Sequence, residues 1–257
     1  MINRKETTRI KVGSVPIGHF APVSVQSMIT TNPVETEKAI AEINRLAEAG
    51  CDLVRLAVPD MAAAKAIKAV KAGARIPLIA DIHFDYTLAL EAIDSGVDGL
   101  RINPGNIGGI DNVVAVIKKA KPKQIPIRIG VNAGSLPTHI LDAYGGHPCA
   151  DGMVEAALEH VRILESLDYK EMKLSIKATD VPLMIEAYQK LSAKVPYPLH
   201  LGVTEAGTIT QGTVKSSIGI GALLAQGIGD TLRVSLTGDP IHEVEVGKTI
   251  LSSLGLR

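Results

Sequence analysis

The stretch "DGLRINPGN" (residues 98–106) has the pattern of a buried strand with an arginine in its middle. Leu100 and Ile102 alternate with Arg101 and Asn103, so one face of the strand is apolar and the other is polar. A fully buried guanidinium without a partner is among the costliest groups that a fold can hold. The pattern therefore predicts that Arg101 has a partner or binds a ligand.

Short apolar runs of this kind alternate with Ala-rich amphipathic stretches along the whole chain. The predicted strands are 23–28, 53–58, 77–83, 99–104, 126–132, 171–178, 198–204 and 231–237. The predicted helices are 35–49, 60–72, 85–95, 109–120, 151–167, 180–194, 212–226 and 239–254. Strict alternation favours a parallel sheet with helical crossovers, and eight such units predict an α/β fold of the (β/α)8 TIM-barrel type. A doubly wound open sheet is the alternative, but "SVQSMITTNP" (residues 24–33) is not the glycine-rich loop that such sheets carry after their first strand.

The 257 residues are expected to form a single barrel domain, 1–257. Within residues 1–20, "RIKVGSVPIG" predicts a β-hairpin that turns at Gly13 and Ser14 and plugs the N-terminal end of the barrel. The long connection 133–150 follows the fifth strand, so it lies at the C-terminal end, where TIM barrels carry their active sites.

Composition excludes several classes of function. The formal net charge is zero, so there is no overall basic field of the kind that attracts nucleic acid or a membrane surface. Aromatic residues make up 3% and Trp is absent, which weakens any base-stacking role. The N-terminus lacks the apolar core of a signal peptide and no apolar run is long enough to span a membrane, so we expect a cytoplasmic protein. Cys51 and Cys149 are too few for a four-ligand zinc or iron–sulfur site within one chain, so no metal ligand is predicted.

The polar faces of the strands share one unusual feature. Because the apolar faces must meet the helices, the polar faces point into the barrel, which most TIM barrels fill with aliphatic side chains. The inward-pointing residues are predicted to be Arg55, Asp81, His83, Arg101, Asn103, Arg128, Asn132, Lys173, Ser175, Lys177, His200, Thr204, Arg233 and Ser235. So many facing cations would repel one another, and arginines suit bidentate contact with phosphate. The pattern therefore predicts a receptor for a polyanion, most simply a diphosphate.

Simpler interpretations exist for single residues. One inward arginine is often a structural ion pair, although the inward acids evident here are only Asp81 and, just past a strand, Glu205. His83 and His200 could each be hydrogen-bonded histidines of the core. Asp81 and His83 also have the spacing of an Asp-x-His metal pair, but no third ligand follows at a telling spacing.

The ordered motifs resemble the barrel of one family, the 4-hydroxy-3-methylbut-2-enyl diphosphate synthases, over the full length of the chain. The motifs are "SVQSM", "VRLAVP", "ADIHFDY", "LRINPGNIG", "IPIRIGVNAGSL", "KLSIKATD", "LHLGVTEAG" and "GIGDTLRVSLTGDP". The resemblance implies reductive opening of 2-C-methyl-D-erythritol 2,4-cyclodiphosphate in the non-mevalonate isoprenoid pathway, with two electrons consumed and water lost. It also implies a homodimer, with flavodoxin or ferredoxin as the electron donor.

The resemblance assigns roles to particular residues. It implies diphosphate ligands at Arg55, Arg101, Arg128, Lys177, Arg233 and Ser235, and polar substrate contacts at Asp81, His83, Asn103, Asn132 and Thr204. It implies a catalytic acid at Glu205 in "VTEAG". The family carries a [4Fe–4S] cluster on three cysteines and a glutamate of a C-terminal domain, whereas this sequence ends at "LSSLGLR" without a matching cysteine segment. We therefore expect the substrate barrel without its cluster domain, binding no cofactor itself and inactive when isolated.

Two other functions fit the same residues. One is a cluster-free transferase on a dihydropteroate synthase-like barrel, which would also seat a diphosphate but would want a stacking pocket for a pterin. The other is a module that binds a phosphorylated ligand without catalysis.

Overall fold

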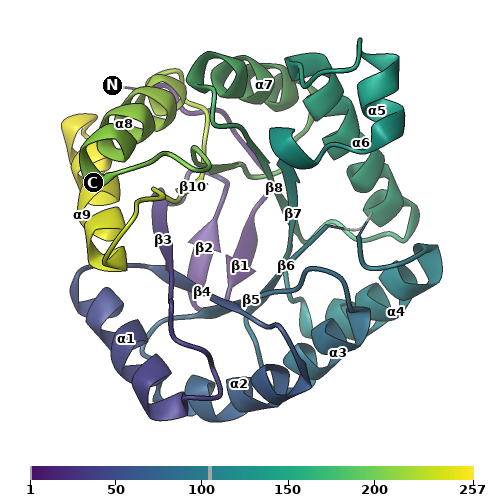
Figure 1. Ribbon diagram of the computed structural model, residues 1–257, viewed down its shortest axis with the longest axis vertical. Coiled ribbons are helices and arrows are strands. Elements are labelled where there is room, and N and C mark those ends of the chain that lie inside the picture. The colour runs from purple at the N-terminus through teal and green to yellow at the C-terminus, as the bar shows by residue number, and fades with distance from the viewer. Residues whose placement is uncertain (1, 104–105) are drawn as a thin grey trace.

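A computed structural model describes residues 2–103 and 106–257, and within them eight parallel strands are surrounded by a ring of helices (Figure 1). The strands are β3 (Ser24–Met28), β4 (Leu53–Ala57), β5 (Leu78–Asp81), β6 (Gly99–Ile102), β7 (Ile127–Asn132), β8 (Met172–Lys177), β9 (His200–Leu201) and β10 (Thr231–Leu232). They pair in the order β8-β7-β6-β5-β4-β3-β10-β9, and a bridge between Leu174 and Leu199 joins the two ends. The predicted TIM barrel is therefore confirmed, and the open-sheet alternative is wrong.

The helices lie close to their predicted ranges. They are α1 (Thr36–Glu48), α2 (Met61–Gly73), α3 (Tyr86–Asp94), α4 (Ile110–Ala120), α5 (Thr138–Ala143), α6 (Ala150–Ser166), α7 (Val181–Lys194), α8 (Ile209–Ala225) and α9 (Pro240–Ser253), with 3₁₀ turns η1 (Lys121–Lys123) and η2 (Ala133–Ser135). Asp180 and Asp239 cap α7 and α9, each accepting a backbone hydrogen bond and followed by a proline in the first turn. None of the helices in the described parts of the chain is long and apolar enough to cross a membrane.

Some boundaries differ from the prediction. The last two predicted strands, 198–204 and 231–237, are shorter in the structure, where they are β9 and β10. After Leu201 and Leu232 the two segments are joined by isolated backbone hydrogen bonds, such as that from Arg233 N to Leu201 O (2.9 Å). Helix α8 begins three residues early because the Thr208 side chain caps it. The connection 133–150 contains η2 and α5. Pro104, at the end of the predicted strand 99–104, lies outside the described residues.

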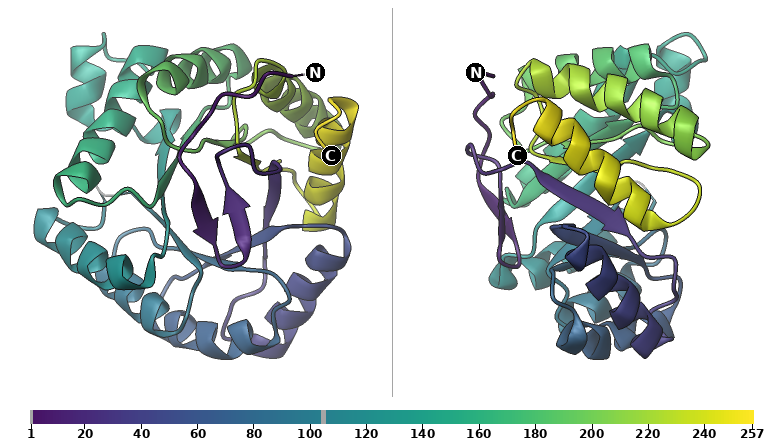
Figure 2. Two further views of the ribbon diagram at one scale, coloured as in Figure 1. Left: turned by 180° about the vertical axis from the view of Figure 1, so that it is seen from behind. Right: turned by 90° about the vertical axis from the view of Figure 1, so that its left-hand side faces the viewer.

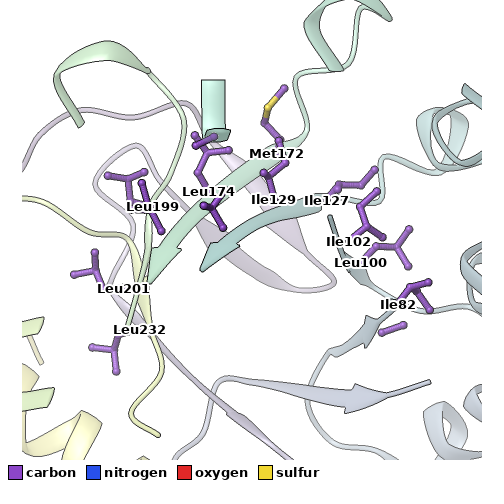
Figure 3. Packing of buried hydrophobic residues seen from close by; sticks show 14 of the residues in the cluster. Ile82, Leu100, Ile102, Ile127, Ile129, Met172, Leu174, Leu199, Leu201 and Leu232 are labelled. Atoms are coloured by element: carbon purple, nitrogen blue, oxygen red, sulfur yellow. The ribbon is translucent and has the colours of Figure 1, made fainter. Parts of the chain in front are cut away.

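The apolar faces of the strands pack outward against the helices, as alternation requires. Figure 3 shows these side chains pointing away from the barrel centre, among them Leu100, Ile102, Ile129 and Leu174, all of which are essentially inaccessible to solvent. This layer belongs to one continuous apolar cluster that includes the inner faces of the helices. The polar faces consequently line the lumen.

An N-terminal hairpin lies across one end of the barrel (Figure 2). Strands β1 (Ile10–Val12) and β2 (Val15–Ile17) pair antiparallel around a turn in which Gly13 has a φ of 56°, a conformation that glycine adopts easily. Ile10, Val12 and Ile17 pack against Leu53 and Ile79 on the lumen side of β4 and β5. The hairpin therefore plugs the N-terminal end with apolar side chains, and the lumen opens toward the C-terminal ends of the strands.

Candidate functional site: a cation-lined cavity in the barrel

A cavity of about 160 Å³ opens at the C-terminal ends of the strands. It is lined by Arg55, Asp81, His83, Arg101, Arg128, Gly130, Asn132, Ser175, Lys177, Thr204, Arg233 and Ser235. Ten of the twelve residues to which the family resemblance assigned roles therefore meet in one place. The two others are Asn103, partly buried just after β6, and Glu205.

Asp81 lies at the centre of the ion pairs in this cavity. Its buried carboxylate is 3.1 Å from Nη1 of Arg101 and 3.3 Å from Nε of Arg55. His83 Nε2 is 3.4 Å from the same carboxylate, although the imidazole ring itself is largely exposed at the rim. Burial alone would raise the pKa of Asp81, but the contact with His83 and the charges of the arginines lower it well below its usual range. Asp81 therefore stays ionised and holds two arginine side chains in place.

Arg233 is paired with a carboxylate that the sequence analysis missed. Nε and Nη2 of Arg233 lie 3.2 and 3.1 Å from the two carboxylate oxygens of Glu243, which is buried at the start of α9. Glu243 also accepts hydrogen bonds from the Ser27 hydroxyl and from the backbone N–H of Leu236. The prediction that inward-reaching acids are limited to Asp81 and Glu205 is wrong, because a helix residue reaches between the strands. The sequence feature that could have revealed Glu243 is its position on the buried side of α9, where every other residue is apolar.

Arg128 and Lys177 form no ion pair with a carboxylate of residues 2–103 or 106–257. Both are buried, and Nε and Nη1 of Arg128 have no hydrogen-bond partner within the described parts of the chain. Burial and the neighbouring arginines lower the pKa of Lys177 well below its usual range. A buried cation without an ion-pair partner is costly, so a negative charge nearby would stabilise Arg128 and the protonated form of Lys177.

Two glycines make room for the cationic side chains. A Cβ atom added at Gly130 would lie 3.1 Å from Nε of Arg101. One added at Gly202 would lie 2.6 Å from Nζ of Lys177 and 2.6 Å from the backbone oxygen of Arg233. Gly130 in β7 and Gly202, directly after β9, therefore leave space that the charged side chains of neighbouring strands occupy.

Glu205 lies in an adjoining space at the rim. A second cavity of about 480 Å³ is lined by Glu205, Asp180, Leu183 and the η2 turn, and shares Asn132 and Thr204 with the first cavity. Glu205 is exposed and has a φ of 49°, in the left-handed region that non-glycine residues seldom adopt. The two cavities together present a cation-lined floor and, beside it, a solvent-facing carboxyl group.

The described residues do not fit an iron–sulfur cluster. The Cys51 thiol is buried against the backbone oxygens of Val25 and Leu53, and burial raises its pKa to about 12. Cys149 lies elsewhere, at the start of α6, where its sulfur accepts a hydrogen bond from Gly152 N. Within the described ranges no group of three or more His, Cys, Asp or Glu side chains is placed to hold a metal ion. The Asp81–His83 pair accordingly has no third ligand there.

Comparison with known proteins identifies the family. The model of the GcpE TIM-barrel domain matches residues 7–248. The chain belongs to the GcpE family. This GcpE barrel is 57% identical over 254 residues to a 4-hydroxy-3-methylbut-2-en-1-yl diphosphate synthase (flavodoxin) of Geobacter sulfurreducens, covering 99% of this chain and 72% of that protein. It is 58% identical, with the same coverage, to the synthase of that name from Clostridium perfringens.

Solved structures show the same architecture in other enzymes. A dihydropteroate synthase from Yersinia pestis superposes with a TM-score of 0.69 at 12% identity, covering 97% of this chain and all of that one. A 3-dehydroquinate dehydratase from Geobacillus kaustophilus gives a TM-score of 0.68 at 14% identity, with 96% of each chain covered. At such low identity these neighbours share the fold of the GcpE barrel alone.

Proposed function

We propose that this chain is the substrate-binding barrel of a 4-hydroxy-3-methylbut-2-en-1-yl diphosphate synthase acting on 2-C-methyl-D-erythritol 2,4-cyclodiphosphate. The observation that carries the proposal is the cavity lined by four arginines and Lys177, in which Arg128 and Lys177 have no carboxylate contact within the described residues. A diphosphate supplies the missing negative charges. Family membership and the names of the relatives support this choice of diphosphate.

The binding roles follow from the contacts of each side chain. Arg128 and Lys177 would bind the phosphoryl oxygens most strongly, because they make no competing ion pair in the described structure. Arg55, Arg101 and Arg233 present guanidinium groups that Asp81 and Glu243 already orient. Preoriented donors lose little side-chain entropy on binding, which favours a tight and well-defined diphosphate position. Ser235 and Asn103 would add neutral hydrogen bonds to the ligand.

The carbon skeleton of the ligand would extend toward the rim, beside His83, Asn132, Thr204 and Glu205. Opening of the ring and loss of water consume two electrons and two protons, and the departing oxygen must be protonated. Glu205 is suited to proton transfer because it is a carboxyl group, whereas the arginines beneath it stay protonated. The described residues do not fit an iron–sulfur cluster, so the electrons are proposed to come from outside the barrel, with flavodoxin as the proposed donor and ferredoxin as the alternative.

The same proposal includes a homodimer that works in the cytoplasm. The outer face of α8 supports self-association, because Val214 and Ile218, one turn apart, are large apolar residues that lie exposed on it. Sedimentation analysis of the chain, compared with an Ile218→Lys variant, tests this part. A dimer weakened by the substitution is expected.

Titration calorimetry tests the proposed function. The chain should bind the cyclic diphosphate and should bind 6-hydroxymethyl-7,8-dihydropterin diphosphate much more weakly, since the rim offers no Trp and few aromatic residues for stacking. Preference for the pterin diphosphate would favour the transferase alternative. Equal affinity for every diphosphate would favour a binding module without catalytic specificity.

A further inference from the structure

A second group of polar side chains lies in the lumen one layer below the cavity. On β8, Lys177 and Ser175 line the cavity, and alternation places Lys173 two residues deeper on the same face. His200 on β9 lies below Gly202 in the same way. Both side chains are buried, and neither Lys173 Nζ nor His200 Nε2 has a hydrogen-bond partner in the described structure.

Arg128 connects this deeper layer to the cavity. Its Cα pairs with that of Lys173 in the β7–β8 register, while its side chain forms part of the cavity lining. Burial lowers the pKa of Arg128, but a guanidinium starts from so high a value that it keeps its proton at neutral pH. Lys173 therefore faces a permanent positive charge on the neighbouring strand.

No carboxylate in the described lumen forms an ion pair with Arg128 or Lys173, although the charge of Asp81 favours the charged form of Arg128 from a distance. Asp81 on β5 is engaged by Arg55 of β4 and Arg101 of β6, and Glu243 of α9 is engaged by Arg233. The other titratable groups near Lys173 are His200 on β9 and, one layer above on the same strand, Lys177. Neutral polar side chains of the deep lumen include Ser24 and Gln26 on β3 and Thr231 on β10. Burial, and then the charge of Arg128, lower the pKa of Lys173 to about 7. Above neutral pH the free protein thus holds this amine mainly in its uncharged form.

We propose that Lys173 is a further residue of the anion site, which takes up a proton when a diphosphate binds to the cavity above it. The inference rests on the proposed function, because it requires a diphosphate ligand. The negative charges of the ligand would offset the charge of Arg128, so the repulsion that keeps Lys173 neutral would fall. The amine lone pair then takes a proton from solvent to give an ammonium group, and no bond to the ligand forms or breaks.

His200 does not compete for this proton. Burial, followed by the charges of Arg128, Lys177 and Lys173, lowers its pKa well below the ordinary value, so a protonated Lys173 disfavours an imidazolium still further. Lys177 contributes proton uptake of its own, because it contacts the ligand directly. Removal of Lys173 should therefore abolish part of the proton uptake and leave the remainder.

Calorimetric titration with the cyclic diphosphate, in several non-phosphate buffers of different ionisation enthalpy, measures the number of protons taken up. Each phosphorus of this ligand carries one strongly acidic hydroxyl, so exchange near neutral pH belongs to the protein. The wild-type chain should take up protons at pH 8, and the uptake should fall toward pH 6, where Lys173 is already protonated. Linkage then makes the association constant increase as the pH falls from about 9 to 7.

A Lys173→Met variant shows whether the proton uptake belongs to Lys173. Lys170→Met, at an exposed position just before β8, is the matched control. Lys173→Met should lose close to one proton of uptake at pH 8 and bind the ligand more weakly, whereas Lys170→Met should match the wild type. Circular dichroism should show both variants folded, since Lys173→Met removes a buried amine without a partner. Equal proton uptake in the wild type and Lys173→Met would overturn the inference alone. Failure of the wild-type chain to bind the cyclic diphosphate would overturn the proposed function, and the inference with it.

Discussion

Arg233 and Glu243 form a two-point ion pair across the wall of the barrel, with Nη2 of the arginine 3.1 Å from the carboxylate. The pair joins the end of β10 to α9. Glu243 also accepts hydrogen bonds from Ser27 of β3 and from the backbone N–H of Leu236, so its carboxylate holds three segments together. Asp81 differs in having two arginine partners, Arg55 and Arg101. Because Glu243 has one arginine partner and Asp81 has two, we expect the stability of the fold to depend more on Arg233 than on Arg101.

Arg233→Ala should destabilise the unliganded protein far more than Arg101→Ala does. Loss of Arg233 leaves the buried Glu243 carboxylate without a cation, which costs about 3–5 kcal/mol of the free energy of unfolding. Loss of Arg101 leaves Asp81 still paired with Arg55, so the effect should stay below about 1 kcal/mol. Urea unfolding measures both. An Arg233→Met/Glu243→Gln double variant should recover most of the loss, and equal costs for the two single variants would refute this assignment of Glu243.

Gly130→Ala and Gly202→Ala should separate binding from stability. At Gly130 the added methyl group meets the Arg101 guanidinium at 3.1 Å, so the side chain shifts, diphosphate affinity falls and the fold persists. At Gly202 the methyl group meets the backbone oxygen of Arg233 at 2.6 Å, so the strands must move and the unfolding midpoint should fall clearly. Gly221→Ala on α8, where nothing lies within 4 Å, serves as the control and should be neutral or slightly stabilising. Calorimetry measures the diphosphate affinity of each variant, and thermal unfolding measures its midpoint. A lower midpoint for Gly130→Ala than for Gly202→Ala would contradict the prediction.

Stability should rise with pH just above neutrality. Lys173 has a folded-state pKa of about 7, below the value of about 10.4 for an unfolded chain, so the unfolded state binds more protons between these values. The free energy of unfolding should therefore increase from pH 7 to about 8.5, by up to about 1.4 kcal/mol per pH unit for each such lysine. Comparison with Lys173→Met cancels the contribution of the Cys51 thiol, which in the unfolded chain begins to titrate near the upper end of this range. A variant with the same pH slope as the wild type would show that Lys173 is charged in the folded protein.

Glu205→Gln should separate catalysis from binding. Glu205 lies outside the cation-lined cavity, so the substitution should leave the affinity of the barrel for the cyclic diphosphate within about threefold, or about 0.7 kcal/mol. In a full-length synthase of this family that contains its redox centre, the matching change should lower turnover by roughly 100-fold or more, as expected for a lost general acid. Normal turnover with altered affinity would make Glu205 a binding residue.

Strand alternation made most of the site predictable. Once Leu100 and Ile102 had to face the helices, Arg101 had to face the lumen, and the same logic placed Arg55, Arg128 and Lys177 beside it. Glu243 could not be found in this way, because it reaches the lumen from a helix and alternation considers strands alone. For Lys173, the structure was needed to show that the buried amine has no hydrogen-bond partner among the described residues, because alternation gives the face of a side chain and not its contacts.

The position of the bound cyclic diphosphate in a crystal of this chain tests the central claim most directly. Both phosphoryl groups should lie inside the barrel, within hydrogen-bonding distance of Arg128 and Lys177, with the carbon skeleton directed toward Thr204 and Glu205. Phosphoryl groups bound on the outer surface, or an empty lumen at saturating ligand, would contradict the claim that these cations form a diphosphate receptor.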